Sequence, residues 1–288
     1  MTTSTGPAWV KSERQLERER LRRRAGLRSA GVASASTIAF LVLAGVLIVT
    51  SPGWDRVQRT FLSWPDFTAS FPDVLRGFGE NIVMFLIAEP LILVIGLLVA
   101  MVRSVKAPVF FPLRALAVLY TDLFRGVPTL LLIFLVGFGV PALDLQGTPS
   151  DPMVLGVSAL VLSYGAYVAE VFRAGIDSVH PSQRAAARSL GLSHLQTMRF
   201  VVLPQAIRRV IPPLLNDFIS LQKDTALVAT LGVVETLRQA QIYSAEHFNY
   251  TPYVGAAVLF IALTVPLARF TDYLARRSEQ RREAGSTT

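Results

Sequence analysis

The sequence predicts an all-α polytopic membrane protein with about six transmembrane helices. Of its 288 residues, 52% are hydrophobic and 17% are charged, whereas soluble domains carry about 25% charged residues. Several uncharged runs approach about 20 residues, the length that crosses the hydrocarbon core of a bilayer. Most of the 28 Lys and Arg residues fall in four segments, 1–29, 103–114, 173–209 and 269–282. The positive-inside rule places these segments and both termini in the cytoplasm, which requires an even number of spans.

Composition also narrows the classes of function. The net charge of +8 reflects cytoplasmic loops of a membrane protein and does not indicate nucleic-acid binding. The chain has no Cys, which excludes disulfides and thiolate metal sites, and its three His residues are widely separated. No phosphate-binding loop of the GxxxxGK[ST] type is present. We therefore expect no catalytic residues, no metal site and no cofactor bound by this chain.

The N-terminal part divides into a tail, a span, a loop and a second span. Residues 1–29 form a basic tail, and residues 30–50 contain no charge and no Pro. The latter predict a first span, the alternative being a cleaved signal peptide. Residues 51–78, rich in Pro and aromatic residues, are predicted to be an external loop. Residues 79–102 are predicted to form the second span, broken at Glu89-Pro90.

Glu89 is unusual because a carboxylate at bilayer depth is costly and must face protein or a water-filled cavity. Two interpretations stay open. Glu89 lines a solute path, or it is a protonated, buried residue at a proline kink.

The remaining elements follow in order. A basic loop covers 103–114, a third span continues to about Val140, a turn covers 141–152 and a fourth span runs from about Met153 to Ala174. The predicted fifth span begins after Pro204, bends at Pro212-Pro213 and is interrupted at Lys223-Asp224-Thr225, as broken membrane helices are. Then come a polar external segment at 235–250, a sixth span at 251–272 and a basic tail at 273–288.

The most informative stretch is Gln183–Pro204, which is polar and basic although apolar spans flank it. Ser182 is placed to cap a first short helix, which Gly191 ends. Ser193 and Gln196 have the spacing of a capping box for a second helix. The pattern predicts a helix-turn-helix that serves as a docking surface. A plain solvated loop is the alternative, but such loops rarely combine paired caps and a glycine stop.

This stretch resembles the EAA loop of ABC-importer permeases. That pattern reads Glu-Ala-Ala, three residues, Gly, nine residues, an aliphatic residue, any residue, Leu-Pro. Here Ala186-Ala187, Gly191 and Leu203-Pro204 match it, and Ala185 occupies the Glu position. The resemblance implies a set of ATPase-coupling residues: Ala185, Ala186, Ala187, Arg188, Ser189, Leu190, Gly191, Leu203 and Pro204.

Three flanking segments are similar to the polar amino-acid uptake subfamily, the histidine, glutamine and glutamate permeases. They are Tyr120–Pro128, Tyr164–Ile176 and Phe218–Leu227. The resemblance covers roughly Phe78–Arg276. It implies a five-helix permease core at 79–272, with a coupling loop at 175–204, preceded by one extra N-terminal span. Within the first segment, Asp122 and Arg125 are three residues apart and are expected to pair on one helical face.

The resemblance implies the permease subunit of an ATP-driven importer for polar amino acids, of the glutamate or glutamine type. Its expected partners are a cytoplasmic ATPase that holds ATP-Mg, an extracytoplasmic substrate-binding protein, a second permease subunit in a homo- or heterodimer, and the lipid bilayer. The expected location is the cytoplasmic (inner) membrane. The predicted residues of the translocation path are Glu89, Asp122, Arg125, Glu170, Lys223, Asp224 and Thr225.

Two other functions are alternatives. A secondary amino-acid transporter without an ATPase would need paired inverted repeats, and no internal repeat is visible. An intramembrane hydrolase would need Asp177, Ser178 and His180 to act together. These three crowd into four residues of a polar loop, a spacing that does not bring them together on one helix or strand.

Overall fold

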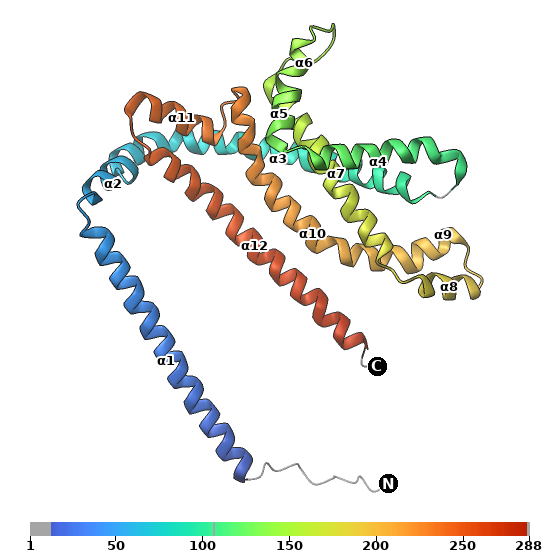
Figure 1. The fold of residues 1–288 in the computed structure, drawn as a ribbon, viewed down its shortest axis with the longest axis horizontal. Coiled ribbons are helices and arrows are strands. Elements are labelled where there is room, and N and C mark those ends of the chain that lie inside the picture. The colour runs from blue at the N-terminus through green and yellow to red at the C-terminus, as the bar shows by residue number, and fades with distance from the viewer. Residues whose placement is uncertain (1–12, 106, 287–288) are drawn as a thin grey trace. The chain divides into compact units, whose positions relative to one another are not determined.

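The structure, a computed structural model, describes residues 13–105 and 107–286. Every secondary-structure element among the described residues is a helix, and these residues include no strand. The chain separates into two units, Met1–Arg59 and Thr60–Thr288. Figure 1 shows the elements of both units along the chain.

The first unit contains α1 (Glu13–Val49) and most of α2 (Trp54–Phe61). The predicted first span corresponds to Gly31–Val49 of α1. Its side chains are largely exposed. The basic tail predicted for 1–29 is therefore helical from Glu13 onward and continuous with the span. The part of this tail before Glu13 lies outside the described residues, as do 287–288 of the C-terminal tail.

The second unit holds the remaining helices. In order they are α3 (Trp64–Ser104), η1 (Pro108–Phe110), α4 (Phe111–Gly126), α5 (Thr129–Gly137), α6 (Gly139–Ala142), α7 (Pro152–Asp177), α8 (Pro181–Ser189), α9 (His194–Thr197), η2 (Met198–Val202), α10 (Leu203–Asp224), η3 (Thr225–Leu231), α11 (Thr236–His247) and α12 (Thr251–Ser286).

The central helix of this unit is α7, which packs against α3, α4, α5 and α10. In its most apolar window 67% of residues are buried, against 28% in the window of α3 and 11% in that of α12. The largest core cluster joins Met84 and Ile92 of α3, Leu160 of α7, Leu221 of α10 and Val228 of η3. The many apolar side chains left exposed on the other helices suit contact with lipid.

The segment 51–78, predicted to be an external loop, is mostly helical, because α2 and the start of α3 occupy it. Ser63 caps α3 by accepting a hydrogen bond from the backbone N–H of Asp66. Pro65 follows in the first turn, where its missing N–H has no consequence. Phe67 and Phe71 stack four residues apart on this helix, with ring centroids 5.0 Å apart. The aromatic residues therefore mark one helical face.

Two further predictions about the spans need correction. The helix α3 is continuous through Pro90 and does not end there. The predicted third span is instead two helices, α4 and α5, bent by 106°. Pro128 explains the bend, because it disfavours helical backbone at the preceding Val127, which is extended with ψ 129°.

Length and hydropathy identify four candidate spans among the described residues, or five if α4 and α5 form one broken span. The predicted fifth span, α10, is not among these candidates, because its 22 residues include five charged ones: Arg208, Arg209, Asp217, Lys223 and Asp224. The predicted interruption at 223–225 is nevertheless visible, since the α-helix ends at Asp224 and continues as a 3₁₀ segment.

Candidate functional site

The segment 181–204, here called the basic hairpin, folds as two short helices around Gly191. The N–H of Gly191 donates to the carbonyl of Arg188, and that of Leu192 donates to Ala187. These bonds form a Schellman motif, which needs a left-handed residue, and Gly191 has φ +84°. The predicted glycine stop is confirmed by this geometry.

The caps of the hairpin agree with the prediction at one end only. Ser193 and Gln196 form the expected capping box: the N–H of Gln196 donates to Ser193 Oγ and the N–H of Ser193 donates to Gln196 Oε1, at 3.2 and 2.8 Å. The predicted cap by Ser182 is wrong. His180 precedes Pro181, and its Nδ1 accepts from the N–H of Ser182. An imidazole can fill this role because it carries an acceptor nitrogen.

The hairpin presents an exposed surface to its surroundings. Leu190 is 84% exposed and Leu195 is 76% exposed. Ala187 is buried, whereas the other predicted coupling residues are exposed: Ala185, Ala186, Arg188, Ser189, Leu203 and Pro204. Exposed leucines at a rigid turn suit a protein partner.

Two arginines bind the end of α7: Arg184 belongs to the hairpin and Arg209 belongs to α10. The guanidinium of Arg184 donates to the carbonyl of Ile176, and that of Arg209 donates to the carbonyl of Ser178. The last carbonyls of a helix have no partner within it, so cations bind them readily. The hairpin and α10 are thereby both attached to the end of α7.

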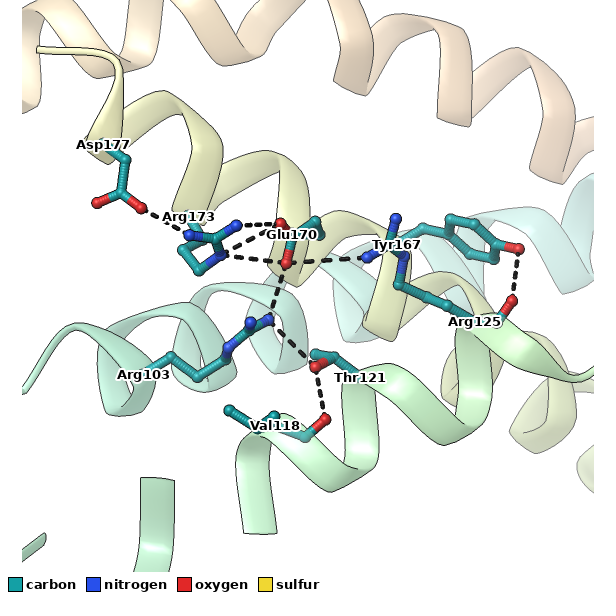
Figure 2. Close-up of polar contacts among 8 residues, drawn as sticks. All are labelled: Arg103, Val118, Thr121, Arg125, Tyr167, Glu170, Arg173 and Asp177. Carbon is teal, nitrogen blue, oxygen red and sulfur yellow. Dashed lines mark hydrogen bonds and ion pairs between the residues drawn. The ribbon is translucent and has the colours of Figure 1, made fainter. Parts of the chain in front are cut away.

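A second group of charges gathers around Glu170 of α7 (Figure 2). Arg103 Nη1 lies 2.9 Å from Glu170 Oε2 and also donates to Thr121 Oγ1 at 3.1 Å. Arg173 donates to the same carboxylate and to Asp177, the latter at 2.7 Å. The side chains of Arg103 and Glu170 are only 13% and 22% exposed. One carboxylate therefore connects α3, α4 and α7.

The predicted pair of Asp122 with Arg125 is wrong. Among the described residues Asp122 forms no ion pair, and it is exposed. Arg125 instead lies 3.9 Å from Glu170 and stacks over the ring of Tyr167, 5.6 Å from its centroid. Sequence reasoning missed Arg103 as a member of this site because it was assigned to a loop. Its position at the end of a long apolar helix is the feature that could have identified it.

The ionisable residues at depth lie on α3, α7 and α10. Tyr164 Oη donates to Asp224 Oδ2 at 2.8 Å. Glu89 is partly buried. Asp217 Oδ2 is buried and, among the described residues, has no hydrogen-bond partner. Asp217 and Tyr164 were not among the predicted path residues, although a charge in an apolar stretch is such an indication.

The other two predicted path residues differ in environment. Lys223 is exposed, whereas Thr225 is fully buried. Thr225 Oγ1 donates to the carbonyl of Gln222 and accepts from Asn81, a residue that sequence reasoning did not select.

The arrangement of Asp177, Ser178 and His180 gives no support to a hydrolase. Ser178 Oγ donates to the carbonyl of Gly175, and Asp177 pairs with Arg173. His180 Nδ1 lies 2.7 Å from Ser182 Oγ. Within the described part of the chain, no three His, Cys, Asp or Glu side chains are grouped so as to hold a metal ion.

These features define an integral membrane transport component: apolar helices that can cross a bilayer, ionisable side chains among them, and a rigid basic hairpin. A family model described as "Binding-protein-dependent transport system inner membrane component" matches residues 92–280. The chain belongs to this family, that of the ABC-importer permeases.

Comparisons with individual proteins agree. The chain is 34% identical over 216 residues to a probable amino-acid permease protein, YxeN, of Bacillus subtilis (strain 168), covering 75% of this chain and 95% of that protein. It is 34% identical to the probable glutamine ABC transporter permease protein GlnM of the same organism, covering 73% and 95%. A solved structure described as "Crystal structure of an amino acid ABC transporter with histidines" matches with a TM-score of 0.68 and 31% identity, over 75% of this chain and 98% of that chain. The chain is thus a permease of the amino-acid ABC-importer type.

Proposed function

We propose that this chain forms half of the translocation path of an ATP-driven importer for polar amino acids, of the glutamate or glutamine type. A cytoplasmic ATPase hydrolyses ATP-Mg and drives the path through the basic hairpin, and the chain itself catalyses no reaction. The observation that carries the proposal is the hairpin, whose exposed Leu190 and Leu195 stand on a turn fixed by a Schellman motif and a capping box.

The hairpin is built to transmit movement. Arg184 attaches it to the end of α7, Arg209 attaches α10 to the same end, and α10 begins where the hairpin ends. A displacement of the hairpin by an ATPase therefore acts directly on the two helices that carry Tyr164, Asp217 and Asp224. Among interacting proteins, a rigid surface element loses little conformational entropy on binding.

The path residues suit an amino-acid zwitterion. The carboxylates of Glu89, Asp217 and Asp224 can meet an α-ammonium group, and Lys223 or a helix N-terminus can meet the α-carboxylate. This chemistry does not by itself select one amino acid. The glutamate or glutamine preference rests on the motif segments and on relatives such as GlnM, while another relative at 33% identity is named "Arginine transport system permease protein ArtQ".

The remaining parts of the assembly complete the proposal. A second permease subunit supplies the other half of the path, and an extracytoplasmic binding protein delivers the solute. The chain lies in the cytoplasmic membrane with both termini and the hairpin on the cytoplasmic side, as its basic segments indicate.

The experiment changes one exposed leucine of the hairpin. Leu190→Asp should leave the fold intact, because Leu190 is 84% exposed, but it should reduce co-purification of the ATPase subunit and uptake of labelled glutamine and glutamate. Leu145→Asp is the matched control, since Leu145 is also exposed, at 57%, and lies in the turn between α6 and α7.

Loss of ATPase binding and uptake in Leu190→Asp, with both retained in Leu145→Asp, supports the proposal. Full ATPase binding in Leu190→Asp would refute coupling through this surface. Uptake by the wild-type chain in the absence of any ATPase would refute an ATP-driven importer.

A further inference from the structure

A fully buried asparagine joins three elements at one point of the second unit. Asn81 of α3 is 0% exposed. Its Nδ2 donates to Glu235 Oε2 at 2.9 Å and to Thr225 Oγ1 at 3.1 Å. Its Oδ1 accepts from the backbone N–H of Thr236 at 3.1 Å. Both amide hydrogens and the carbonyl oxygen are thus used, and they link α3 to η3 and α11.

The partner of Asn81 is a buried carboxylate. Glu235 is 0% exposed and caps α11 by accepting from the N–H groups of Arg238 and Leu237, at 2.8 and 3.0 Å. Among the described residues no cation forms an ion pair with it. Burying a charge is costly unless hydrogen bonds replace its water, so the donation from Asn81 contributes directly to holding Glu235 inside. We call this Asn81–Glu235–Thr225 group the latch.

The latch lies at the junction where α10, the helix that follows the basic hairpin, ends and a 3₁₀ segment begins. Thr225 begins the 3₁₀ segment η3, immediately after Asp224 ends α10. Asp224 is bound to Tyr164 of α7, and Gln222 Oε1 accepts from Thr264 of α12 at 3.3 Å. The junction 222–225 is therefore tied to α3, α7 and α12 by side chains of three nearby residues.

A second contact fixes the distance between α3 and α11. Gly77 lies one turn before Asn81, and a Cβ at this position would come within 2.6 Å of the carbonyl carbon of Glu235. The two backbones thus touch beside the latch, which leaves Asn81 little freedom to choose other partners. The polar contacts and the close packing hold the same two elements together.

We propose that Asn81 and Glu235 are positioning residues for transport: the latch holds η3 and α11 still against α3 while α10 moves, so that movement of the hairpin reaches the path residues. This inference rests on the proposed function. The inferred role of this buried contact is to control how much solute is moved per ATP hydrolysed.

The test exchanges the roles of donor and acceptor in the latch. Asn81→Asp places a second carboxylate against Glu235 and breaks the latch. Glu235→Gln weakens it more gently, by removing the buried charge. The double variant restores a donor on residue 235 and an acceptor on residue 81. Glu80→Gln is the control, because Glu80 is the exposed neighbour of Asn81 on α3.

Each variant is assembled with its ATPase and binding protein in proteoliposomes, and glutamine uptake is divided by ATP hydrolysis. We expect the ratio to fall about fivefold in Glu235→Gln, because the amide has one acceptor oxygen where the carboxylate uses two, so that one buried hydrogen bond is lost with the charge. The ratio should fall further in Asn81→Asp and recover in the double variant. Hydrogen exchange of the amides at 225–238 should rise in both single variants and return toward the wild-type rate in the double variant.

An unchanged uptake-to-ATP ratio in Glu235→Gln, or a double variant no better than Asn81→Asp, would overturn the proposal. A latch that matters only for folding would lower the yield and leave this ratio unchanged. If the wild-type assembly takes up no glutamine, the proposed function fails for that solute. The exchange measurement then still decides whether the latch holds η3 and α11.

Discussion

A methyl group added at Gly77 gives the sharpest test of the contact between α3 and α11. In Gly77→Ala the new Cβ would lie 2.6 Å from the carbonyl carbon of Glu235, 2.7 Å from the nitrogen of Thr236 and 2.8 Å from the oxygen of Glu235. All three are backbone atoms, so no side chain can rotate away. The helices must separate by most of an ångström to restore ordinary contact, which also stretches the hydrogen bonds of Asn81.

The magnitude follows from a comparison within the same helix. Overpacking of this kind costs about 1–3 kcal/mol, whereas replacing Gly by Ala inside a helix gains about 1 kcal/mol. Gly79 lies two residues further along α3 and has no atom within 4 Å of an added Cβ. Gly79→Ala receives the helical gain alone, so the difference between the two variants isolates the packing cost.

Thermal unfolding of the purified protein in detergent measures this difference. Each kcal/mol shifts the midpoint by about 2–4 °C for domains of 150–250 residues. We expect Gly79→Ala to unfold at or above the wild-type midpoint and Gly77→Ala several degrees below Gly79→Ala. Equal midpoints for the two variants would refute the close contact of α3 with Glu235 and Thr236.

Three more predictions address coupling, the path and topology. Gly191→Val should leave the protein inserted but loosen ATPase binding and stop uptake, because a left-handed backbone costs about 1–2 kcal/mol for a residue with a Cβ; normal uptake would contradict coupling through the hairpin. If Glu89 lines the path, Glu89→Gln should lower uptake or change solute preference with little loss of folded protein. If Glu89 is only structural, Glu89→Gln should be nearly silent and Glu89→Leu should cost about 1 kcal/mol in stability. Since the chain has no Cys, a Cys introduced at Thr5 should resist an impermeant thiol reagent in intact cells, and one at Ser150 should react. Labelling at Thr5 would contradict a cytoplasmic N-terminus.

Local sequence rules predicted the hairpin well because its geometry is set locally. A left-handed glycine and a capping box depend on residues within one or two turns, and Gly191 and Ser193 behave as expected. The same rules failed at Ser182, because the helix begins earlier, at Pro181, and His180 is its N-cap, accepting from the N–H of Ser182. Short-range patterns therefore locate a cap more reliably than they identify the residue that provides it.

Two of the residues that sequence reasoning missed, Arg103 and Asn81, have partners that are distant along the chain. Arg103 contacts Glu170, and Asn81 contacts Glu235, across 67 and 154 positions. No spacing rule relates such pairs, because their approach depends on how α3 packs against α7 and α11. The expected pairing of Asp122 with Arg125 was wrong for the same reason, since Glu170 offers Arg125 a carboxylate from another helix.

The helix α10 connects the part of the site that sequence could predict with the part that it could not. Its 22 residues span about 33 Å at 1.5 Å per residue, which is close to the thickness of the hydrocarbon core. A movement at Leu203 must therefore either appear at Asp224 or be absorbed within the helix. Pro212 and Pro213 are the positions where bending costs least, because each removes a backbone hydrogen bond to the preceding turn. The contacts at the far end of α10 decide between these outcomes, since a junction held firmly by Asn81 and Tyr164 resists displacement as a rigid body.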